Sequence, residues 1–184
     1  MTEDKSMTDE QYKKLSINEF TKAAAKYEGN HAGIYEMCKK DYPEILEELE
    51  QEPFQDLLDA GCGPAPMISL LAEKYPDRHY TGLDLTPAMI EQAKLKHIPN
   101  AVFVVADCEN FPFEENAFDA IICSSSFHHY PNPQAFFNSV KRCLRPGGEY
   151  GKIRSSNIET AKHLDFSKTV ERQDNFQEHS PRVI

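Results

Sequence analysis

Short apolar runs alternate with helical patterns between residues 54 and 148, and this alternation constrains the fold more than any other feature. The strand-like runs are FQDLLD, HYTGLD, AVFVV and FDAIIC, which begin at residues 54, 79, 101 and 118. A strand, a helix and a second parallel strand form a right-handed unit, and successive units cover both faces of one sheet. The pattern therefore predicts a Rossmann-like α/β fold, with a doubly wound, mostly parallel sheet and helices on both faces.

The segments before and after this alternation have a different character. Ser16 and Glu19 have capping-box spacing, and apolar residues follow them at helical intervals, which predicts an N-terminal helical cap. Beyond the Gly-Gly pair at 147–148 the apolar pattern fades, so we expect the C-terminal strands of such a fold to be missing or altered. We therefore expect a flexible N-terminus (1–15), a helical cap (16–53), an α/β domain (54–154) and an atypical, truncated tail (155–184).

A fifth strand is predicted near residues 149–154, where Tyr150 and Ile153 give some apolar content. Without further strands it would form an unprotected edge of the sheet, and such edges pair readily with other chains. We expect this edge to be covered by the tail itself or by a second copy of the chain in a homodimer.

The composition excludes several classes of protein. The formal net charge is −10, whereas nucleic-acid binders carry a basic surface, so no nucleic-acid partner is expected. No run approaches the ~20 apolar residues that span a bilayer, and the first fifteen residues lack the apolar core of a signal peptide. We therefore expect a cytoplasmic protein without a membrane span. The five cysteines form no CxxC pair, so neither a zinc site nor a disulfide framework is predicted.

Residues with binding chemistry fall at the ends of three consecutive strand-like runs. Gly61 and Gly63 lie in the turn after the first run, where glycine lets a ligand approach the backbone. Asp84 ends the second run, where a carboxylate can accept hydrogen bonds from both ribose hydroxyls. Asp107 follows the third run, where an acceptor can bind an exocyclic amine. Because parallel strands end at one edge of their sheet, these residues predict a nucleotide-cofactor crevice there.

The spacing around the glycines narrows the choice of nucleotide. The dinucleotide fingerprint is GxGxxG/A, and its third position here is Pro66, which cannot give the close helix packing that glycine permits. The GK[ST] sequence of a P-loop is absent. Nicotinamide and triphosphate cofactors are therefore disfavoured, and a nicotinamide enzyme would have to tolerate Pro66.

Four motifs, taken in order, resemble those of a known family. They are DAGCGPA, GLDLTPAMIEQAK, VVADCENFPFEENAFDAIICSSSFHHY and CLRPGG. Together they resemble class I S-adenosylmethionine-dependent methyltransferases, and they are most similar to the small-molecule branch that includes the ubiquinone/menaquinone-type enzymes. The resemblance covers about residues 54–148, and the upstream NEFTKAAAKYE is similar to the family's N-terminal helix. It implies S-adenosylmethionine as the cofactor and a small molecule as the methyl acceptor.

The resemblance also implies which residues hold the cofactor. The backbone of the Gly61-Cys62-Gly63 turn, with Asp59 before it, would hold the methionine end. Asp84 would bind the ribose hydroxyls, and Leu85 would lie against the adenine.

The remaining implied residues surround the base and the methyl group. Asp107 would bind the adenine amine, with the backbone of Cys108 contributing. Ser124, just after the fourth run, would border the methionine moiety and the opening for the substrate. Tyr27 in the upstream helix would close the site from above.

His128 and His129 form the pair to which a catalytic role is most readily assigned. Adjacent histidines do not face the same way on a helix, and no third ligand lies at metal spacing, so no metal site is predicted. Two interpretations stay open for His129: a loop histidine that only lines the pocket, and a general base.

Two functions follow from these patterns. The first is methyl transfer to a small molecule by in-line displacement, in which the protein mainly holds the reacting groups in line. The second is a non-catalytic or degenerate S-adenosylmethionine-binding remnant that acts through a partner, because the altered tail reduces the elements that shape a substrate pocket. Both predict cofactor binding in the same crevice, and turnover separates them.

Overall fold

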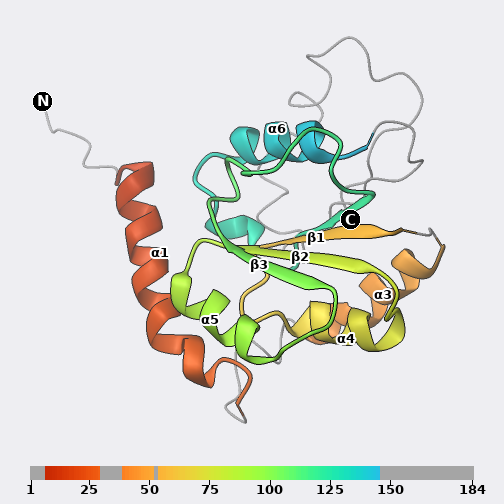
Figure 1. Ribbon diagram of the computed structural model, residues 1–184. Coiled ribbons are helices and arrows are strands. Elements are labelled where there is room, and N and C mark those ends of the chain that lie inside the picture. Colours follow the sequence, from red (N-terminus) through yellow and green to blue (C-terminus); the bar gives the residue numbers. More distant parts are fainter. Residues whose placement is uncertain (1–6, 30–38, 52–53, 146–184) are drawn as a thin grey trace, which may run out of the picture.

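The computed structural model of the chain describes residues 7–29, 39–51 and 54–145. Its centre is a sheet of four parallel strands in the order β3-β2-β1-β4 (Figure 1). This confirms the predicted Rossmann-like parallel sheet. The strands are β1 (Asp56–Ala60), β2 (His79–Asp84), β3 (Ala101–Val105) and β4 (Ala120–Ile122).

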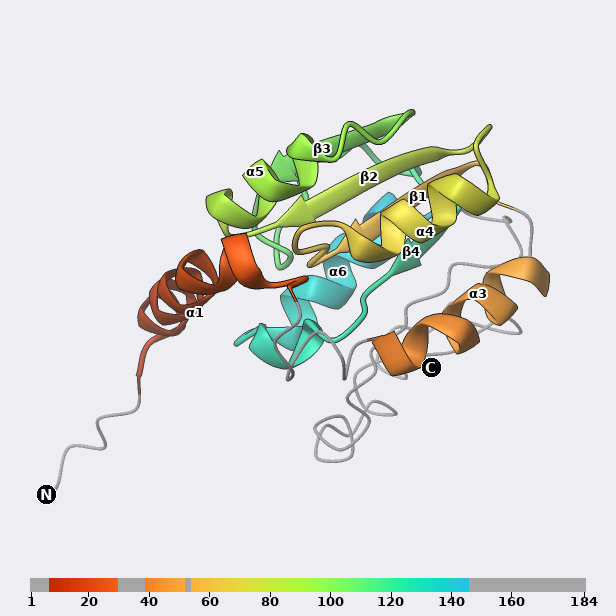
Figure 2. The same cartoon turned by 90° about the horizontal axis from the view of Figure 1, so that it is seen from below.

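Helices cover both faces of the sheet. α3, α4 and α5 lie on one side of it and α6 lies on the other (Figures 1 and 2). α4, α5 and α6 each begin at a proline, which is tolerated there because the first N–H groups of a helix have no partner within it. The α-helices are α1 (Asp9–Ala23), α3 (Tyr42–Gln51), α4 (Pro66–Lys74), α5 (Pro87–Leu95) and α6 (Pro133–Cys143), and the 3-10 helices are η1 (Ala24–Lys26), η2 (Lys39–Asp41) and η3 (Phe127–His129).

The two faces of the sheet belong to two hydrophobic cores. In β1, Leu57 packs in the core with α3, α4 and α5, whereas Leu58 packs in the core with α6. β4 alternates in the same way, with Ile122 in the first core and Ile121 in the second. This follows from the two-residue period of a strand, and it explains why the central strands read as continuous apolar runs.

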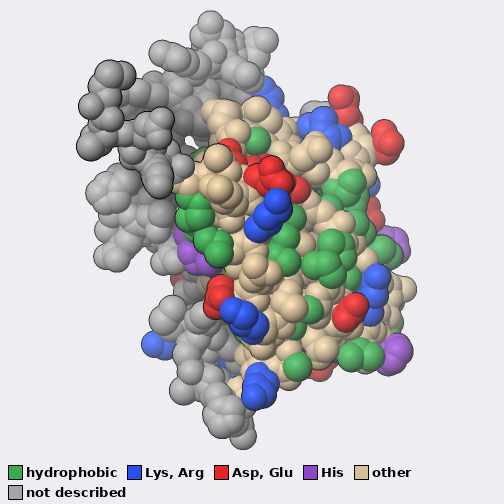
Figure 3. All heavy atoms as spheres, turned by 90° about the vertical axis from the view of Figure 1, so that its left-hand side faces the viewer, with side chains coloured by type: hydrophobic (Ala, Val, Ile, Leu, Met, Phe, Trp, Pro, Cys, Tyr) green, Lys and Arg blue, Asp and Glu red, His purple; other side chains and the backbone are tan. Residues whose placement is uncertain are grey.

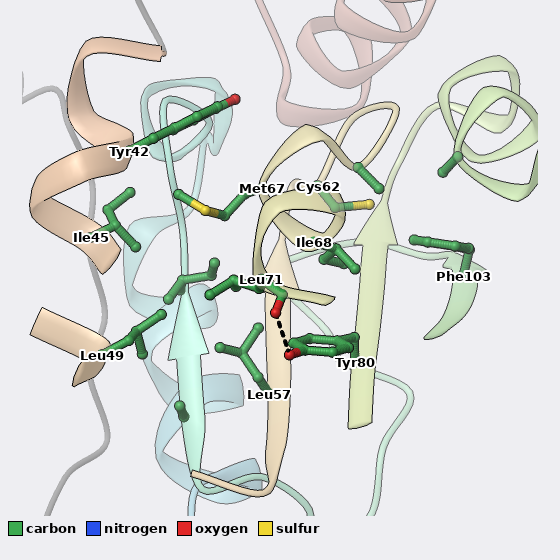
Figure 4. Close-up of a cluster of buried hydrophobic side chains, with 14 of the residues drawn as sticks. Tyr42, Ile45, Leu49, Leu57, Cys62, Met67, Ile68, Leu71, Tyr80 and Phe103 are labelled. Atoms are coloured by element: carbon green, nitrogen blue, oxygen red, sulfur yellow. Dashed lines mark hydrogen bonds between the residues drawn. The ribbon is translucent and has the colours of Figure 1, made fainter. Parts of the chain in front are cut away.

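α3 completes the first core. Its buried side chains Tyr42, Ile45 and Leu49 repeat at helical spacing and point from α3 toward the sheet and α4 (Figure 4). Beneath α4, the hydroxyl of Tyr80 donates a hydrogen bond to the carbonyl of Leu71 (2.9 Å), so the one polar atom of this buried ring is satisfied.

The N-terminal helix begins earlier than the apolar pattern predicts. Thr8 is the N-cap of α1: its hydroxyl accepts a hydrogen bond from the N–H of Gln11, whose side chain accepts one from the N–H of Thr8. The predicted start at Ser16 is therefore wrong, and residues 9–15, which we expected to be flexible, are helical. The first two turns of α1 are mostly polar, so the start is set by its capping box and shows no apolar period.

After α6 the chain returns to the sheet beside β4. Leu144 pairs in parallel with Phe118, and the N–H of Arg145 donates to the carbonyl of Phe118 (2.9 Å). The guanidinium of Arg145 also bridges the carboxylates of Asp56 (2.9 Å) and Asp119 (2.8 Å). These contacts hold the end of α6 against the amino ends of β1 and β4.

Several sequence predictions fall outside the described residues. They are the fifth strand near 149–154, the atypical tail over 155–184 and the sheet edge that would form a homodimer, and all three stay predictions. In the part of the chain that the structure describes, each helix is too short or too polar to cross a bilayer.

Candidate functional site

The order of the strands creates a binding position between β1 and β4. From β1 the chain winds outward through β2 to β3, and it then crosses back to place β4 on the other side of β1. Because the following helices lie on opposite faces, the loops after β1 and β4 separate at the carboxyl ends of these strands. A cavity lies at this edge, and α1 forms its outer wall.

Most of the predicted site residues line this cavity. Those residues are Tyr27, Gly61, Gly63, Asp84, Leu85, Asp107, Cys108, Ser124 and His129. Sequence patterns did not indicate the other lining residues, which are Lys13, Ser16, Phe20, Thr86, Met89, Ser125, Ser126 and Tyr130. Asp59 and Cys62 do not line the cavity, and both residues are buried.

The two glycines of the turn serve different purposes. Gly61 and Gly63 both have positive φ, at +79° and +54°, which glycine adopts without strain. A Cβ atom on Gly61 would lie 2.0 Å from the hydroxyl oxygen of Ser126, so the space beside it is filled. A Cβ atom on Gly63 would meet nothing within 4 Å. The backbone at Gly63 is therefore open to a ligand in the cavity.

A pair of hydroxyl groups ties the loop after β4 to the end of β1. Ser126 Oγ donates a hydrogen bond to the carbonyl of Ala60 (3.0 Å). The Tyr130 hydroxyl lies 2.6 Å from Ser126 Oγ and 3.3 Å from the same carbonyl. Since Ala60 directly precedes Gly61, these side chains fix where the glycine turn begins.

Asp84 supports the same turn from the end of β2. One carboxylate oxygen accepts a hydrogen bond from the N–H of Gly63 (3.0 Å), and the other accepts one from the N–H of Thr86 (2.8 Å). Burial raises the pKa of Asp84, and the two N–H groups oppose that shift. A carboxylate has about four lone-pair sites, so Asp84 can still accept a hydrogen bond from a ligand.

Asp107 is held from two directions. Its Oδ1 accepts a hydrogen bond from the N–H of Glu109 (2.9 Å), and its Oδ2 lies 2.7 Å from the ammonium group of Lys13 on α1. Lys13 also pairs with the carboxylate of Glu109. Burial acts to lower the pKa of Lys13, but its hydrogen bonds to Asp107 and Glu109 outweigh burial, and the pKa is raised.

Asp59 lies behind the glycine turn, in the protein interior. Asp59 is only 3 % exposed. This burial, and to a smaller extent the negative charge of Asp84, raises the pKa of Asp59 to about 7. Burial also raises the pKa of the neighbouring Cys62 thiol, which therefore stays protonated. Asp59 is balanced between its neutral and charged forms near neutral pH, and a cation brought close to it would favour the charged form.

His129 closes the cavity on the side of α1. Its ring packs edge-on against Phe20, with ring centroids 5.0 Å apart, and lies beside the ring of His128. Burial, and then the neighbouring His128, lowers the pKa of His129 to about 4, so the imidazole is neutral at pH 7. Among the described residues, no three His, Cys, Asp or Glu side chains are grouped to hold a metal ion.

Ser124 lines the cavity and carries an unsatisfied polar atom. Its hydroxyl oxygen is buried and has no hydrogen-bond partner within the described segments. A buried polar atom without a partner costs roughly 1–3 kcal/mol. A ligand that hydrogen-bonds this hydroxyl would remove that cost, which makes Ser124 a natural contact for a polar group.

Comparison with known proteins assigns this fold and cavity to a family. The sequence model of a family described as a methyltransferase domain matches residues 58–150, about half of the chain. The chain belongs to the methyltransferase-domain family. This confirms the resemblance to class I S-adenosylmethionine-dependent methyltransferases. The comparisons do not specify the ubiquinone/menaquinone-type branch, which stays a prediction.

Two curated relatives show the extent of the similarity. The phthiotriol/phenolphthiotriol dimycocerosates methyltransferase of Mycobacterium leprae is 35 % identical over 131 residues, which cover 70 % of this chain and 48 % of that protein. The trans-aconitate 2-methyltransferase of Enterobacter sp. (strain 638) is 31 % identical over 121 residues, which cover 66 % of this chain and 47 % of that protein. The matched part of the chain therefore spans about half the length of these relatives.

Solved structures share the fold at lower identity. Phosphoethanolamine N-methyltransferase 1 of Haemonchus contortus, solved with phosphoethanolamine and S-adenosylhomocysteine, is 21 % identical with a TM-score of 0.62, over 76 % of this chain and 31 % of that chain. The [4+2]-cyclase SpnF is 19 % identical with a TM-score of 0.60, over 78 % of this chain and 58 % of that chain. At these identities the likeness shows the fold alone.

Proposed function

We propose that this methyltransferase domain binds S-adenosylmethionine in the cavity between the loops after β1 and β4, and transfers its methyl group to a small-molecule acceptor. The observation that carries the proposal is that Gly63, Asp84 and Asp107, from the ends of three neighbouring strands, line one cavity. The names of both curated relatives support a small-molecule acceptor.

The nucleoside part of the cofactor fits the lining residues. The open space at Gly63 allows the ligand to approach the backbone. Asp84 has lone pairs left for the ribose hydroxyls after its two backbone hydrogen bonds. Asp107 likewise keeps acceptor capacity for the adenine amine, and Leu85 and Met89 offer apolar surface for the base.

The amino-acid part of the cofactor fits the other side of the glycine turn. The partnerless hydroxyl of Ser124 would bond one of its polar groups. An ammonium group near the turn would favour the charged form of Asp59, which does not line the cavity and would act on the ligand only through its charge. Cys62 and Cys108 would contribute through their backbone, and Tyr27 would close the site.

In the methyl-transfer reaction, the main task of the side chains is then to position the reacting groups. S-Adenosylmethionine supplies a methyl group on a positively charged sulfur, which makes that methyl strongly electrophilic. The residues around the cavity hold the acceptor in line with the methyl group and exclude water, and this positioning is the main source of rate. A neutral His129 could accept a proton from the acceptor, but its lowered pKa makes it a weak base, which favours the lining role.

The second candidate is a cofactor-binding domain without turnover. Its support is the polar composition of residues 155–184. The SpnF cyclase, which has the same fold, also illustrates that this fold is not confined to proteins named as methyltransferases.

Transfer of a labelled methyl group from S-adenosylmethionine tests the proposal. The full chain would be incubated with a panel of small hydroxy, carboxy and amino compounds, and Asp84→Asn would be assayed in parallel as the matched variant with weakened cofactor binding. Label transfer that depends on Asp84 supports a methyltransferase. Cofactor binding without transfer to any acceptor class would favour the second candidate.

A further inference from the structure

Helix α1 covers the cavity although none of its own side chains is fully buried. Lys13, Ser16 and Phe20 lie on one face of α1 and line the cavity. Figures 1 and 2 place α1 beside α5, at the edge where the strands end. A helix that buries so little apolar surface depends on a few specific contacts to keep its position.

Lys13 makes the most protected of these contacts. Its ammonium group lies 2.7 Å from Asp107 and also pairs with Glu109, and the three side chains are only 21 %, 34 % and 7 % exposed. The Lys14–Glu10 pair on the same helix is 69 % and 79 % exposed. Opposite charges shielded from water attract more strongly than exposed ones, so the Lys13 pairs contribute more to the position of α1.

The surface on the side of α1 supports this difference between the shielded Lys13 pairs and the exposed charge pairs. Figure 3 shows the face that carries α1, where basic side chains lie beside acidic ones and no large block of one charge forms. Exposed pairs of this kind contribute little to stability. The contacts of Lys13 differ because they reach inward, to carboxylates that follow β3.

A second ion pair holds the other end of the covering segment. Glu28, just after η1, lies 2.5 Å from the ammonium group of Lys96 at the end of α5. Phe20 and Tyr27 line the cavity between the two ion pairs. Residues 8–29 therefore form a strap across the cavity, attached near each end by opposite charges.

We propose that Lys13 is a positioning residue that latches this strap, and that the latch must open before the cofactor enters or leaves. The inference rests on the proposed cofactor function. The physical basis of the latch is that the Asp107 carboxylate has two roles. It holds the ammonium group of Lys13, and it would also bind the adenine amine of the cofactor. The same contact that closes the strap would also fix the position of the Asp107 carboxylate beside the bound base.

The test compares the full chain with Lys13→Met, which keeps an unbranched side chain and removes the charge. Association and dissociation rates of S-adenosylhomocysteine are measured by surface plasmon resonance at low and high salt. In the unchanged chain both rates should rise with salt, because salt screens the ion pairs. In Lys13→Met both rates should be about tenfold faster and should depend less on salt, because only the Glu28–Lys96 pair remains to be screened. A residue that only touched the bound cofactor would alter dissociation alone.

Three further variants separate the latch from a general loss of structure. Lys14→Met removes a neighbouring charge from the exposed face of α1, and both rates should stay unchanged. Lys13→Arg keeps the charge and should restore slow, salt-dependent exchange. In Lys13→Met/Glu109→Gln the buried carboxylate is no longer left without its cation, so fast exchange should persist in a protein of near-normal stability.

Two results would overturn the latch: rates in Lys13→Met equal to those of the unchanged chain, or faster dissociation with unchanged association. If the unchanged chain does not bind S-adenosylhomocysteine, the proposed function fails. Amide hydrogen exchange across α1 then still tests whether Lys13 holds the helix in place. The latch predicts faster amide exchange across α1 in Lys13→Met than in Lys14→Met. Equal exchange in the two variants would contradict it.

Discussion

The hydroxyl of Ser126 fills the space that a side chain on Gly61 would need, since a Cβ atom there would lie 2.0 Å from Ser126 Oγ. The loop after β4 therefore packs directly onto the backbone of the turn after β1. Because both loops line the cavity, the shape of the candidate cofactor site depends on this contact.

Alanine at the two glycines should give two different defects. Gly61→Ala should lower the free energy of unfolding by about 2–4 kcal/mol, from the positive φ together with overpacking against Ser126. Gly63→Ala should lower it by only about 1–2 kcal/mol, from the positive φ alone, but should weaken cofactor binding because its methyl group enters the cavity. Urea unfolding and calorimetric binding measure the two effects. Equal stability of the two variants would contradict the packing of Ser126 on Gly61.

Asp84→Asn should weaken the binding of S-adenosylhomocysteine by about 1–3 kcal/mol, because the amide cannot accept both ribose hydroxyls while it also serves two backbone N–H groups. Isothermal titration calorimetry gives this difference. Asp77→Asn, at an exposed acid in the turn before β2, is the matched control and should bind like the unchanged chain. Unchanged affinity in Asp84→Asn would show that the ribose lies elsewhere.

Asp59 should make the stability of the protein depend on pH. Its pKa is about 7 in the folded chain and near its ordinary value of 3.8 when unfolded, so the folded state holds the proton more tightly. The stability from this group is fully present below pH 3.8 and is lost as the pH rises through about 7. Between pH 5 and pH 8 the loss should be about 2.5 kcal/mol, on top of the titration of other groups.

Asp59→Asn isolates this contribution, because an amide of the same shape does not titrate. Urea unfolding of both proteins at pH 5 and pH 8 should show that the variant gains stability relative to the unchanged chain at the higher pH. If the difference between the two proteins is the same at both pH values, the pKa of Asp59 is not raised by burial.

His129→Phe tests the two interpretations of the cavity histidine. The phenyl ring preserves the edge-on packing against Phe20 and removes the proton acceptor. Since the pKa of His129 is lowered to about 4, we expect turnover to change by less than about threefold. A loss of roughly 100-fold or more, with normal cofactor affinity, would instead identify His129 as a general base.

The elements that local sequence signals define could be predicted. The ends of β1, β2 and β3 could be placed because an apolar run stops at a glycine turn or an aspartate, and a parallel sheet brings such ends to one edge. That is why Gly63, Asp84 and Asp107 were found without the structure, and the structure places all three on the cavity.

The rest of the site depends on packing between distant segments. Lys13 reaches the cavity only because α1 lies beside α5, and no local pattern relates it to Asp107. Ser126 and Tyr130 become important through the carbonyl of Ala60, a contact that tertiary packing alone creates. Asp59 matches its motif but is buried behind the turn, because a motif identifies a residue without showing which way its side chain faces.

Calorimetric titration of the full chain with S-adenosylhomocysteine and, separately, with NAD tests the central claim most directly. A cavity formed by Gly63, Asp84 and Asp107 beside a turn that has proline at the third fingerprint position should bind the first ligand and bind NAD far more weakly. Saturable binding of S-adenosylhomocysteine that is weaker by about 1–3 kcal/mol in Asp84→Asn is the predicted result. NAD binding of equal strength, or no binding of S-adenosylhomocysteine by the folded chain, would contradict the account.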